Sequence, residues 1–330
     1  LEHAGACGHC VQKVSEAEAL AQGGITNIFI SNEVISQTKL ARVATLARAL
    51  NAQGGRLALA VDCEEGITRL ARALQDAQAG DAAMDVLVEI NVGQNRCGAE
   101  PGEAALVLAQ AIAAQPVLRF AGLQAYHGGA QHLRSAEERK TAIEQVLKLV
   151  NRTRHEFDRA GLAIPLITGA GTGTMVNEAA SGIYGEIQPG SFLFMDADYA
   201  ANQRDAAQPL FEHALYVKTQ VMSLSGDHAV CDAGHKAHAI DSGLPRLHAL
   251  APENALRFAN GGDEHGVLHP DADAGNHGGW LPALGESLWL IPGHCDPTVN
   301  LHDHLIGVRG GRLKGVVERI FTVDGRGALT

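Results

Sequence analysis

The feature that most constrains the fold is an alternation over residues 1–195. Short apolar runs rich in β-branched residues alternate there with longer segments of helical periodicity, such as 37–52 and 138–160. A strand, a helix and a second strand in succession predict parallel pairing, because each parallel connection needs a long crossover. The strand-like runs are residues 6–12, 25–31, 57–62, 84–91, 118–126, 164–168 and 185–194.

Seven such runs are one short of the eight strands that close a (β/α)8 barrel. We therefore predict an α/β fold of the TIM-barrel type over residues 1–205. We expect its first strand to lie upstream of Leu1, which is not an initiator methionine.

The pattern changes from about residue 210. The runs 215–224, 228–233, 287–291 and 304–308 look like strands without long helices between them. The turn Arg309-Gly-Gly-Arg312 separates two runs that look antiparallel. We predict that residues 206–330 form a smaller, mainly antiparallel β domain.

Charge and composition exclude several classes of partner. The formal net charge of −11 argues against binding to nucleic acid or to an anionic membrane, since both need a basic surface. No apolar stretch is long enough to span a membrane, and no signal-peptide pattern opens the sequence. Six cysteines in 330 residues do not make a disulfide scaffold, so we expect a reduced, cytoplasmic protein.

A loop rich in glycine and threonine, Thr168-Gly-Ala-Gly-Thr-Gly-Thr174, follows one of the predicted strands. Small residues let backbone N–H groups converge on an anion, and this loop lies where barrels commonly bind phosphate. It is neither a dinucleotide-binding fingerprint nor a Walker A loop. A plain strand-to-helix turn is the alternative. We favour a phosphate site, to which Gly190 and Ser191 after the next strand would supply the other side.

Two further segments lie at predicted carboxyl ends of strands, where barrel enzymes place their chemistry. In Tyr126-His-Gly-Gly-Ala-Gln-His132, the tyrosine can stack on a planar ligand and a histidine can transfer protons. We expect Tyr126 and one of the two histidines to act in the site, and the other histidine to make only a turn hydrogen bond. Arg96 lies among turn-forming residues and can bind an anionic oxygen, although a solvated loop arginine is nearly as common.

His294 and Asp296 lie two residues apart between Pro292 and Pro297. On an extended backbone, side chains two apart point to the same face. An imidazole and a carboxylate on one face can hold a divalent metal and leave positions open for substrate. A lone His-x-Asp pair is common at strand ends, so the pair gains weight only from the rest of the sequence.

Four motifs occur in the order in which one known family carries them. They are Arg96-Cys-Gly98, Tyr126-His-Gly128, the loop that begins at Thr168, and His294-Cys-Asp-Pro-Thr298. Together they closely resemble the D-threonine aldolase and 3-hydroxy-D-aspartate aldolase family. These are fold-type III pyridoxal-phosphate enzymes of the alanine-racemase type. Further matches along the chain are Gln12–Glu16, Ser31–Val34, Gly122–Tyr126, Phe194–Asp196, Asp232–Gly234 and Asp263–Gly266.

The resemblance implies roles for particular residues. His294 and Asp296 would hold the metal, with manganese expected first and magnesium, cobalt or zinc as alternatives. The related D-serine dehydratases carry a cysteine in place of Asp296 and use zinc, so the aspartate favours the aldolase. The implied catalytic residues are Arg96, Tyr126, His132 and Asp263. The implied residues around pyridoxal 5'-phosphate are Gln12, Arg96, Tyr126, Thr168, Gly171, Thr172, Gly173, Gly190 and Ser191.

The sequence departs from the family at the Schiff-base lysine, which the family carries in a His-x-Lys-x-His-Lys segment at the end of the first barrel strand. None of the seven lysines has those neighbours. We expect that lysine, like the first strand, upstream of Leu1. The chain as given is then expected to bind the cofactor weakly and to turn over poorly.

The expected reaction is cleavage of a D-β-hydroxy-α-amino acid to glycine and an aldehyde. The resemblance also implies a homodimer. Two alternatives stay open: a D-serine or D-hydroxyaspartate dehydratase of the same fold, and a non-catalytic pyridoxal-phosphate-binding protein. The second resembles the barrel alone, so the predicted β domain argues against it.

Overall fold

A computed structural model describes residues 1–77, 83–248, 256–271, 280–311 and 314–327. The chain divides into two compact units, which we call unit 1 (Leu1–Pro189) and unit 2 (Gly190–Arg326). The predicted boundary between residues 205 and 206 lies inside unit 2 and stays a prediction. No helix of the described residues is long and apolar enough to cross a membrane.

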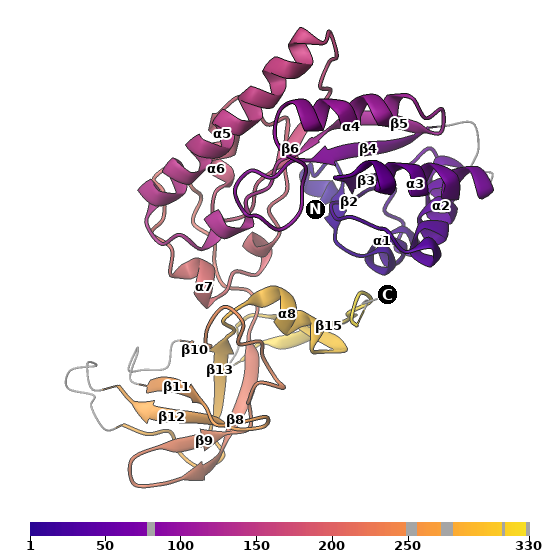
Figure 1. Cartoon of the computed structure of the whole chain (residues 1–330). Helices are drawn as coiled ribbons and strands as arrows, with labels where there is room; N and C mark the ends of the chain where they lie inside the picture. Colours follow the sequence, from indigo (N-terminus) through magenta and orange to yellow (C-terminus); the bar gives the residue numbers. More distant parts are fainter. Residues whose placement is uncertain (78–82, 249–255, 272–279, 312–313, 328–330) are drawn as a thin grey trace. The chain divides into compact units, whose positions relative to one another are not determined.

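Unit 1 contains a curled sheet of parallel strands that pair in sequence order, β1 to β7 (Figure 1). All six neighbouring pairs are parallel, as the alternation predicts. The strands are β1 (His9–Val11), β2 (Asn27–Ile30), β3 (Arg56–Val61), β4 (Met84–Glu89), β5 (Leu118–Gln124), β6 (Ile167–Gly169) and β7 (Glu186–Ile187).

Helices connect these strands and cover the sheet. They are α1 (Val14–Gln22), α2 (Gln37–Asn51), α3 (Glu64–Asp76), α4 (Glu103–Ala113), α5 (Ala136–Arg159) and α6 (Met175–Ala180), with a short 3-10 turn η2 (Gly128–His132) before α5. Strand β4 is buried at every position, and α3 buries residues at helical spacing, including Ile67, Leu70 and Leu74. Sheet and helices therefore share one apolar core.

The predicted strands differ from the observed ones mainly at their ends. The run 185–194 was too long, because β7 ends at Ile187 and Pro189 cannot donate to a ladder. Helix α5 begins two residues earlier than predicted. Ser135 and Glu138 form a capping box there, in which Ser135 Oγ accepts from Glu138 N and Glu138 Oε2 accepts from Ser135 N.

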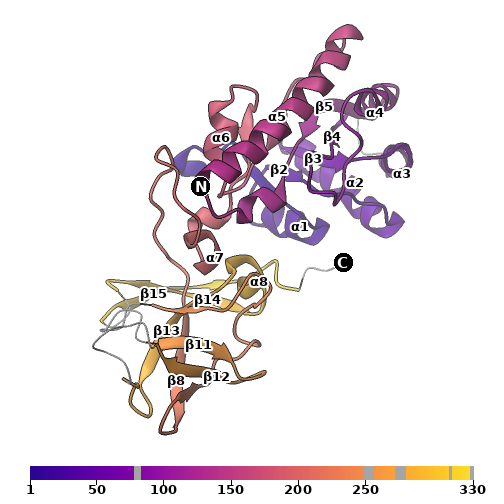
Figure 2. The same cartoon turned by 60° about the vertical axis from the view of Figure 1, so that its left-hand side comes forward.

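Unit 2 is built on a six-stranded antiparallel sheet with the order β10-β13-β8-β9-β12-β11. Its strands are β8 (Val217–Leu224), β9 (Ala229–Cys231), β10 (Arg246–Leu247), β11 (Leu256–Asn260), β12 (Gly266–Pro270) and β13 (Ser287–Ile291). A separate two-stranded ribbon joins β14 (His304–Arg309) to β15 (Val316–Thr322) (Figure 2). Two short helices, α7 (Ala197–Ala200) and α8 (Cys295–Asn300), and a 3-10 turn, η3 (Ser191–Leu193), belong to this unit.

The predicted strands of the β domain are confirmed, and the β14–β15 pair is antiparallel. Arg312 of the predicted turn lies outside the described residues. Strands β10, β11 and β12 were missed. The signal for two of them was alternating burial: Leu256 and Phe258 in β11 and Leu268 in β12 enter the core of unit 2.

Candidate functional site

Arg96 and Tyr126 lie together in unit 1. The Arg96 guanidinium carbon is 5.7 Å from the centre of the Tyr126 ring. The two residues follow β4 and β5, which are neighbours in the sheet, so both lie at its carboxyl edge. Burial raises the pKa of Tyr126, and the charge of Arg96 opposes that rise. Sequence analysis predicted both residues, and the structure brings them together.

The loop that carries Arg96 is fixed by local hydrogen bonds. The Asn91 side-chain oxygen accepts from the N–H groups of Gly93 and Asn95, both at 3.1 Å. Gly98 has φ +102, and a Cβ there would lie 2.5 Å from Asn91 N, so only glycine fits. Gly98 N donates to Asp62 Oδ2 at 3.2 Å, which ties this loop to the end of β3. Arg96 is therefore presented by a turn of defined shape.

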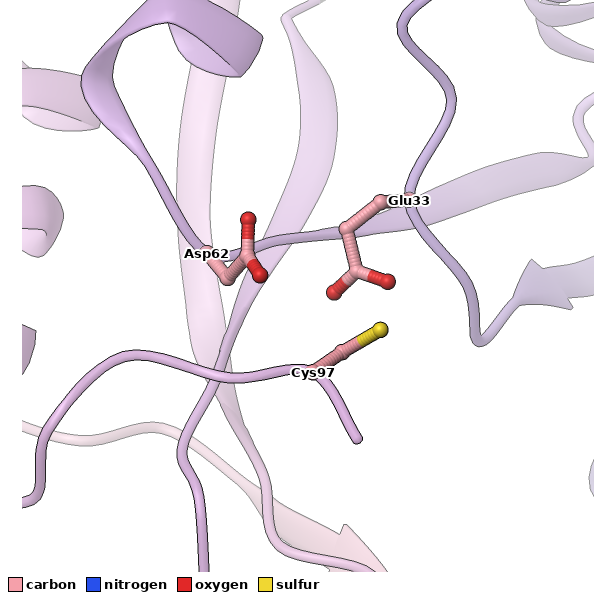
Figure 3. A group of neighbouring side chains, drawn as sticks. All are labelled: Glu33, Asp62 and Cys97. Atoms are coloured by element: carbon pink, nitrogen blue, oxygen red, sulfur yellow. The ribbon is translucent and has the colours of Figure 1, made fainter. Parts of the chain in front are cut away.

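An acidic group lies beside this loop and was not predicted as a site. Glu33, Asp62 and Cys97 point toward one another, with a ligand atom of each within 4.8 Å of the others (Figure 3). Each of the three follows the end of a different strand. In a barrel sequence, that position is the signal that could have identified them as site residues. Burial and the nearby Glu33 carboxylate raise the pKa of the Cys97 thiol to about 11. This donor set has the chemistry to hold a cation.

Glu89, the last residue of β4, adds a fourth acidic side chain to this group. It is 5 % exposed, and burial followed by the charge of Glu33 raises its pKa to about 8. Both Glu33 carboxylate oxygens are buried without a hydrogen-bonding partner in the described residues. At neutral pH Glu89 therefore keeps its proton.

The loop from Thr168 to Thr174 is buried throughout. A Cβ at Gly171 or Gly173 would lie 2.6 Å and 2.7 Å from atoms of Gln131, so these two glycines allow close packing on η2. Gln131 Nε2 donates to Thr174 Oγ1, which donates to Glu178 Oε1. Part of the small-residue pattern is therefore structural, as the turn alternative requires.

The start of the same loop is suited to an anion. Ala170 has φ +69, the left-handed conformation that turns successive N–H groups toward one side. The N–H groups of Ala170 and Gly171 donate no hydrogen bond to any described residue. Thr172 follows and is 2 % exposed. The N–H groups of Ala170 and Gly171 fit the phosphate that was predicted here. Thr168, by contrast, is committed to Glu186 at 3.0 Å and to Gln188 at 2.8 Å.

The two histidines near Tyr126 differ in environment. His132 ends η2 and is exposed. His127 is half-buried, its Nδ1 is buried without a partner in the described part of the chain, and burial lowers its pKa. Of the two histidines that the sequence offers, His127 is therefore the more buried one, and His132 is the one that the resemblance implies as catalytic. Gln12 is exposed after β1, and its Nε2 donates to Ser31 Oγ at 2.8 Å.

Five predicted site residues belong to unit 2, namely Gly190, Ser191, Asp263, His294 and Asp296, so their relation to the phosphate loop stays a prediction. Gly190 is exposed, and the Ser191 hydroxyl lies beside the Cys295 thiol. Asp263 is exposed in the turn between β11 and β12, with an oxygen 2.6 Å from His235 Nε2 and another 3.5 Å from Lys236 Nζ. In unit 2, Asp263 is an ion-pairing turn residue.

His294 and Asp296 follow β13, but the expected extended backbone is wrong. Helix α8 begins at Cys295, with His294 as its N-cap residue and Asp296 in its first turn. Pro297 is accommodated because the first turn needs no N–H donor at that position. Cys295 is 3 % exposed, and burial raises its pKa to about 12, while Asp296 is exposed. The two predicted ligands therefore lie at one helix start, with the cysteine between them packed inward.

The start of α8 is held from several sides within unit 2. Asp196 is fully buried; one of its oxygens accepts from Cys295 N and the other from Tyr199 N, both at 2.9 Å. Thr298 Oγ1 donates to His294 O at 2.6 Å. Ala197 N donates to Pro292 O at 2.9 Å, which anchors the backbone two residues before His294. The backbone at His294 is thus fixed by residues far away in the sequence.

The free donor atoms of this segment fit a divalent cation. His294 Nδ1 is 2.6 Å from Asp241 Oδ2, which leaves Nε2 as the available ring nitrogen. Neither His294 Nε2 nor the Asp296 carboxylate has a hydrogen-bonding partner among the described residues. One imidazole nitrogen and one carboxylate suit zinc, manganese or magnesium with further positions open.

Comparisons with known proteins cover nearly the whole chain. Residues 1–198 match the family described as alanine racemase, N-terminal domain, and residues 214–308 match the one described as putative serine dehydratase domain. The 3-hydroxy-D-aspartate aldolase of Paracoccus denitrificans (strain Pd 1222) is 40% identical over 328 residues, which are 98% of this chain and 79% of that protein.

Two further relatives agree with this result. The D-threonine aldolase of an Arthrobacter species is 42% identical over 325 residues, 98% of this chain and 80% of that protein. The crystal structure of D-threonine aldolase from Filomicrobium marinum superposes with a TM-score of 0.90 at 44% identity, covering 99% of this chain and 84% of that one.

Proposed function

Since the chain belongs to the alanine-racemase-like family that includes D-threonine aldolases and 3-hydroxy-D-aspartate aldolases, it is a carbon–carbon lyase, and we propose that it cleaves D-β-hydroxy-α-amino acids to glycine and an aldehyde. The observation that carries this proposal is similarity to two named aldolases along 98% of the chain. The aspartate at position 296, where the dehydratases of this fold have cysteine, supports the same choice.

Pyridoxal 5'-phosphate is the proposed organic cofactor. The free N–H groups of Ala170 and Gly171, with Thr172 and Gly173, would hold its phosphate. Arg96 and Tyr126 would contact its ring, and Thr168 and Gln12 would lie around it. When bound, the pyridinium ring supplies an electron sink for the electrons of the broken Cα–Cβ bond.

A divalent metal is the second proposed cofactor, with manganese preferred and magnesium, cobalt or zinc as alternatives. His294 and Asp296 would hold it, since their donor atoms are free and their backbone is fixed. When bound, the cation lowers the pKa of the substrate β-hydroxyl. We propose His132 as the base that takes the hydroxyl proton, and Gly190, Ser191 and Asp263 as further binding or catalytic residues.

Assembly and location are proposed from the same family membership. We propose a homodimer in the cytoplasm, because the fold type implies a dimer and the six cysteines contain no disulfide in the described residues. Sedimentation of the purified protein tests the dimer.

A dehydratase of the same fold is the second candidate, and the match of residues 214–308 to a serine dehydratase domain favours it. It would release a keto acid and ammonia. A non-catalytic pyridoxal-phosphate-binding protein would not explain unit 2.

The test is product identification. The chain, expressed with any residues that precede Leu1, is supplied with pyridoxal 5'-phosphate and Mn²⁺ and incubated with D-threonine or 3-hydroxy-D-aspartate, with and without EDTA. Glycine plus an aldehyde, lost with EDTA, is the expected result. A keto acid plus ammonia would identify the dehydratase instead.

A further inference from the structure

A single hydrogen bond in unit 2 joins His294 to a residue 53 positions earlier in the sequence: His294 Nδ1 lies 2.6 Å from Asp241 Oδ2. We propose that Asp241 is a positioning residue for the metal site, which fixes the tautomer and orientation of the His294 ring. This inference rests on the proposed function, in which His294 is a metal ligand. Asp241 itself is not proposed as a ligand.

The chemistry follows from the two ring nitrogens. A carboxylate only accepts, so the ring nitrogen that faces Asp241 must carry the hydrogen. The lone pair of the neutral imidazole then lies on Nε2, the atom that has no partner in the described residues. Metal-binding histidines commonly donate their other N–H to a carboxylate, which orients the ring and makes it a better ligand. Asp241 therefore sets the tautomer and the orientation of the His294 ring in the metal-free protein.

The fold brings the Asp241 turn to His294 through a close backbone approach. A Cβ at Gly293 would overlap the carbonyl oxygen of Gly243, so only glycine at position 293 lets this turn pack against the residue before His294. Gly243 has φ +119, which also favours glycine. The contact is therefore built into the backbone of both segments.

Two hydroxyl groups complete the arrangement. Ser242 Oγ donates to Asp241 Oδ2 at 3.0 Å and lies 3.3 Å from His294 Nδ1, which steadies the carboxylate beside the ring. Thr298 Oγ1 accepts from Ala239 N at 3.1 Å and donates to His294 O at 2.6 Å, so it joins the segment before Asp241 to α8. Different hydrogen bonds therefore hold Asp241 and the His294 backbone in place, whereas a pair of free surface side chains would have no such support.

Unit 2 offers a matched control for this pair. Asp227 Oδ1 lies 2.7 Å from His228 Nδ1, nearly the same contact, but the two residues are adjacent in sequence and the Asp227 side chain is 87% exposed. Replacing Asp227 with asparagine removes an equivalent carboxylate that has no link to His294. It should leave metal binding unchanged.

The experiment measures the dissociation constant for Mn²⁺ alone, from the electron paramagnetic resonance signal of free Mn²⁺, on protein without pyridoxal phosphate or substrate. Its variants are Asp241→Asn, Asp241→Ala, Asp241→Glu, Asp227→Asn and His294→Ala. We expect Asp241→Asn and Asp241→Ala to weaken Mn²⁺ binding by about 10- to 100-fold. Asp241→Glu should recover part of the loss, and metal-free melting temperatures of the asparagine variants should match the wild type.

The outcomes separate this inference from the proposed function. If His294→Ala leaves Mn²⁺ binding intact, the metal site itself is misplaced. If His294→Ala abolishes binding while both Asp241 variants bind like the wild type, the metal site stands and the positioning role of Asp241 is wrong. A similar loss in Asp227→Asn would mean that general charge explains the effect, and would also overturn the inference.

Discussion

In unit 1, the charge of Glu33 acts on the buried Glu89, and both buried oxygens of Glu33 lack a hydrogen-bonding partner among the described residues. In unit 2, Asp196 accepts two backbone N–H groups and Asp241 accepts an imidazole and a hydroxyl. Both units place acidic groups near proposed cofactor residues, but Glu33 of unit 1 lacks the donors that Asp196 and Asp241 have in unit 2. Burial and the charge of Glu33 raise the pKa of Glu89 in unit 1, whereas the acids of unit 2 organise the backbone and a ring.

The difference follows from how each unit brings its polar residues together. In unit 1, parallel strands end at one edge, so polar residues that follow different strands meet there whether or not their charges match. In unit 2, the segments around His294 approach through loops that place donors opposite acceptors. Arg96 is the cation that partly offsets the charge in unit 1, since its charge lowers the pKa of Glu89.

The largest effect is expected from removing the organising acid of unit 2. In Asp196→Ala, the N–H groups of Cys295 and Tyr199 lose their acceptor in a buried position. At about 1–3 kcal/mol for each of the two unsatisfied donors, we expect the free energy of unfolding to fall by about 2–6 kcal/mol. Urea denaturation measures the loss, and Asp227→Asn serves as the exposed control. A loss no larger than that of the control would show that Asp196 does not organise α8.

A smaller effect of opposite sign is expected in unit 1 from Glu89→Gln. The pKa of Glu89 is about 8 in the folded protein against an ordinary value of 4.5, so the folded state holds a proton that the unfolded state releases. This contribution to stability is complete below pH 4.5 and is lost as the pH rises to about 8.

A glutamine side chain at this position cannot ionise, so the variant should match the wild type in acid and exceed it in unfolding free energy by up to about 5 kcal/mol at alkaline pH. Thermal unfolding across that pH range checks the prediction. A variant less stable than the wild type above pH 8 would contradict the raised pKa of Glu89.

Much of this fold follows from the sequence, because the spacing of apolar residues indicates which faces of the helices and strands are buried. The seven parallel strands and the β14–β15 hairpin were predicted, and the aldolase family resemblance is confirmed by relatives about 40% identical. Strands β11 and β12 were missed although their buried residues, Leu256, Phe258 and Leu268, alternate with more exposed ones.

The site was predictable only where neighbouring residues carry the chemistry. His294 and Asp296 are two residues apart, so a sequence motif names them. Asp241 is 53 residues from His294 and Asp196 is 99 residues from Cys295, and no local pattern predicts such partners. The raised pKa of Glu89 depends on burial and on the nearby charge of Glu33, which are properties of the packed structure.

The central claim is that His294 and Asp296 hold the metal on which cleavage depends. The most direct measurement compares glycine release from D-threonine by the wild type and by Asp296→Ala, each expressed with any residues that precede Leu1, loaded with pyridoxal 5'-phosphate and titrated with Mn²⁺. The account predicts that Asp296→Ala loses about 100-fold or more of the activity while the absorbance of the bound cofactor persists. An Asp296→Ala variant that cleaves D-threonine at the wild-type rate in the presence of EDTA would contradict it.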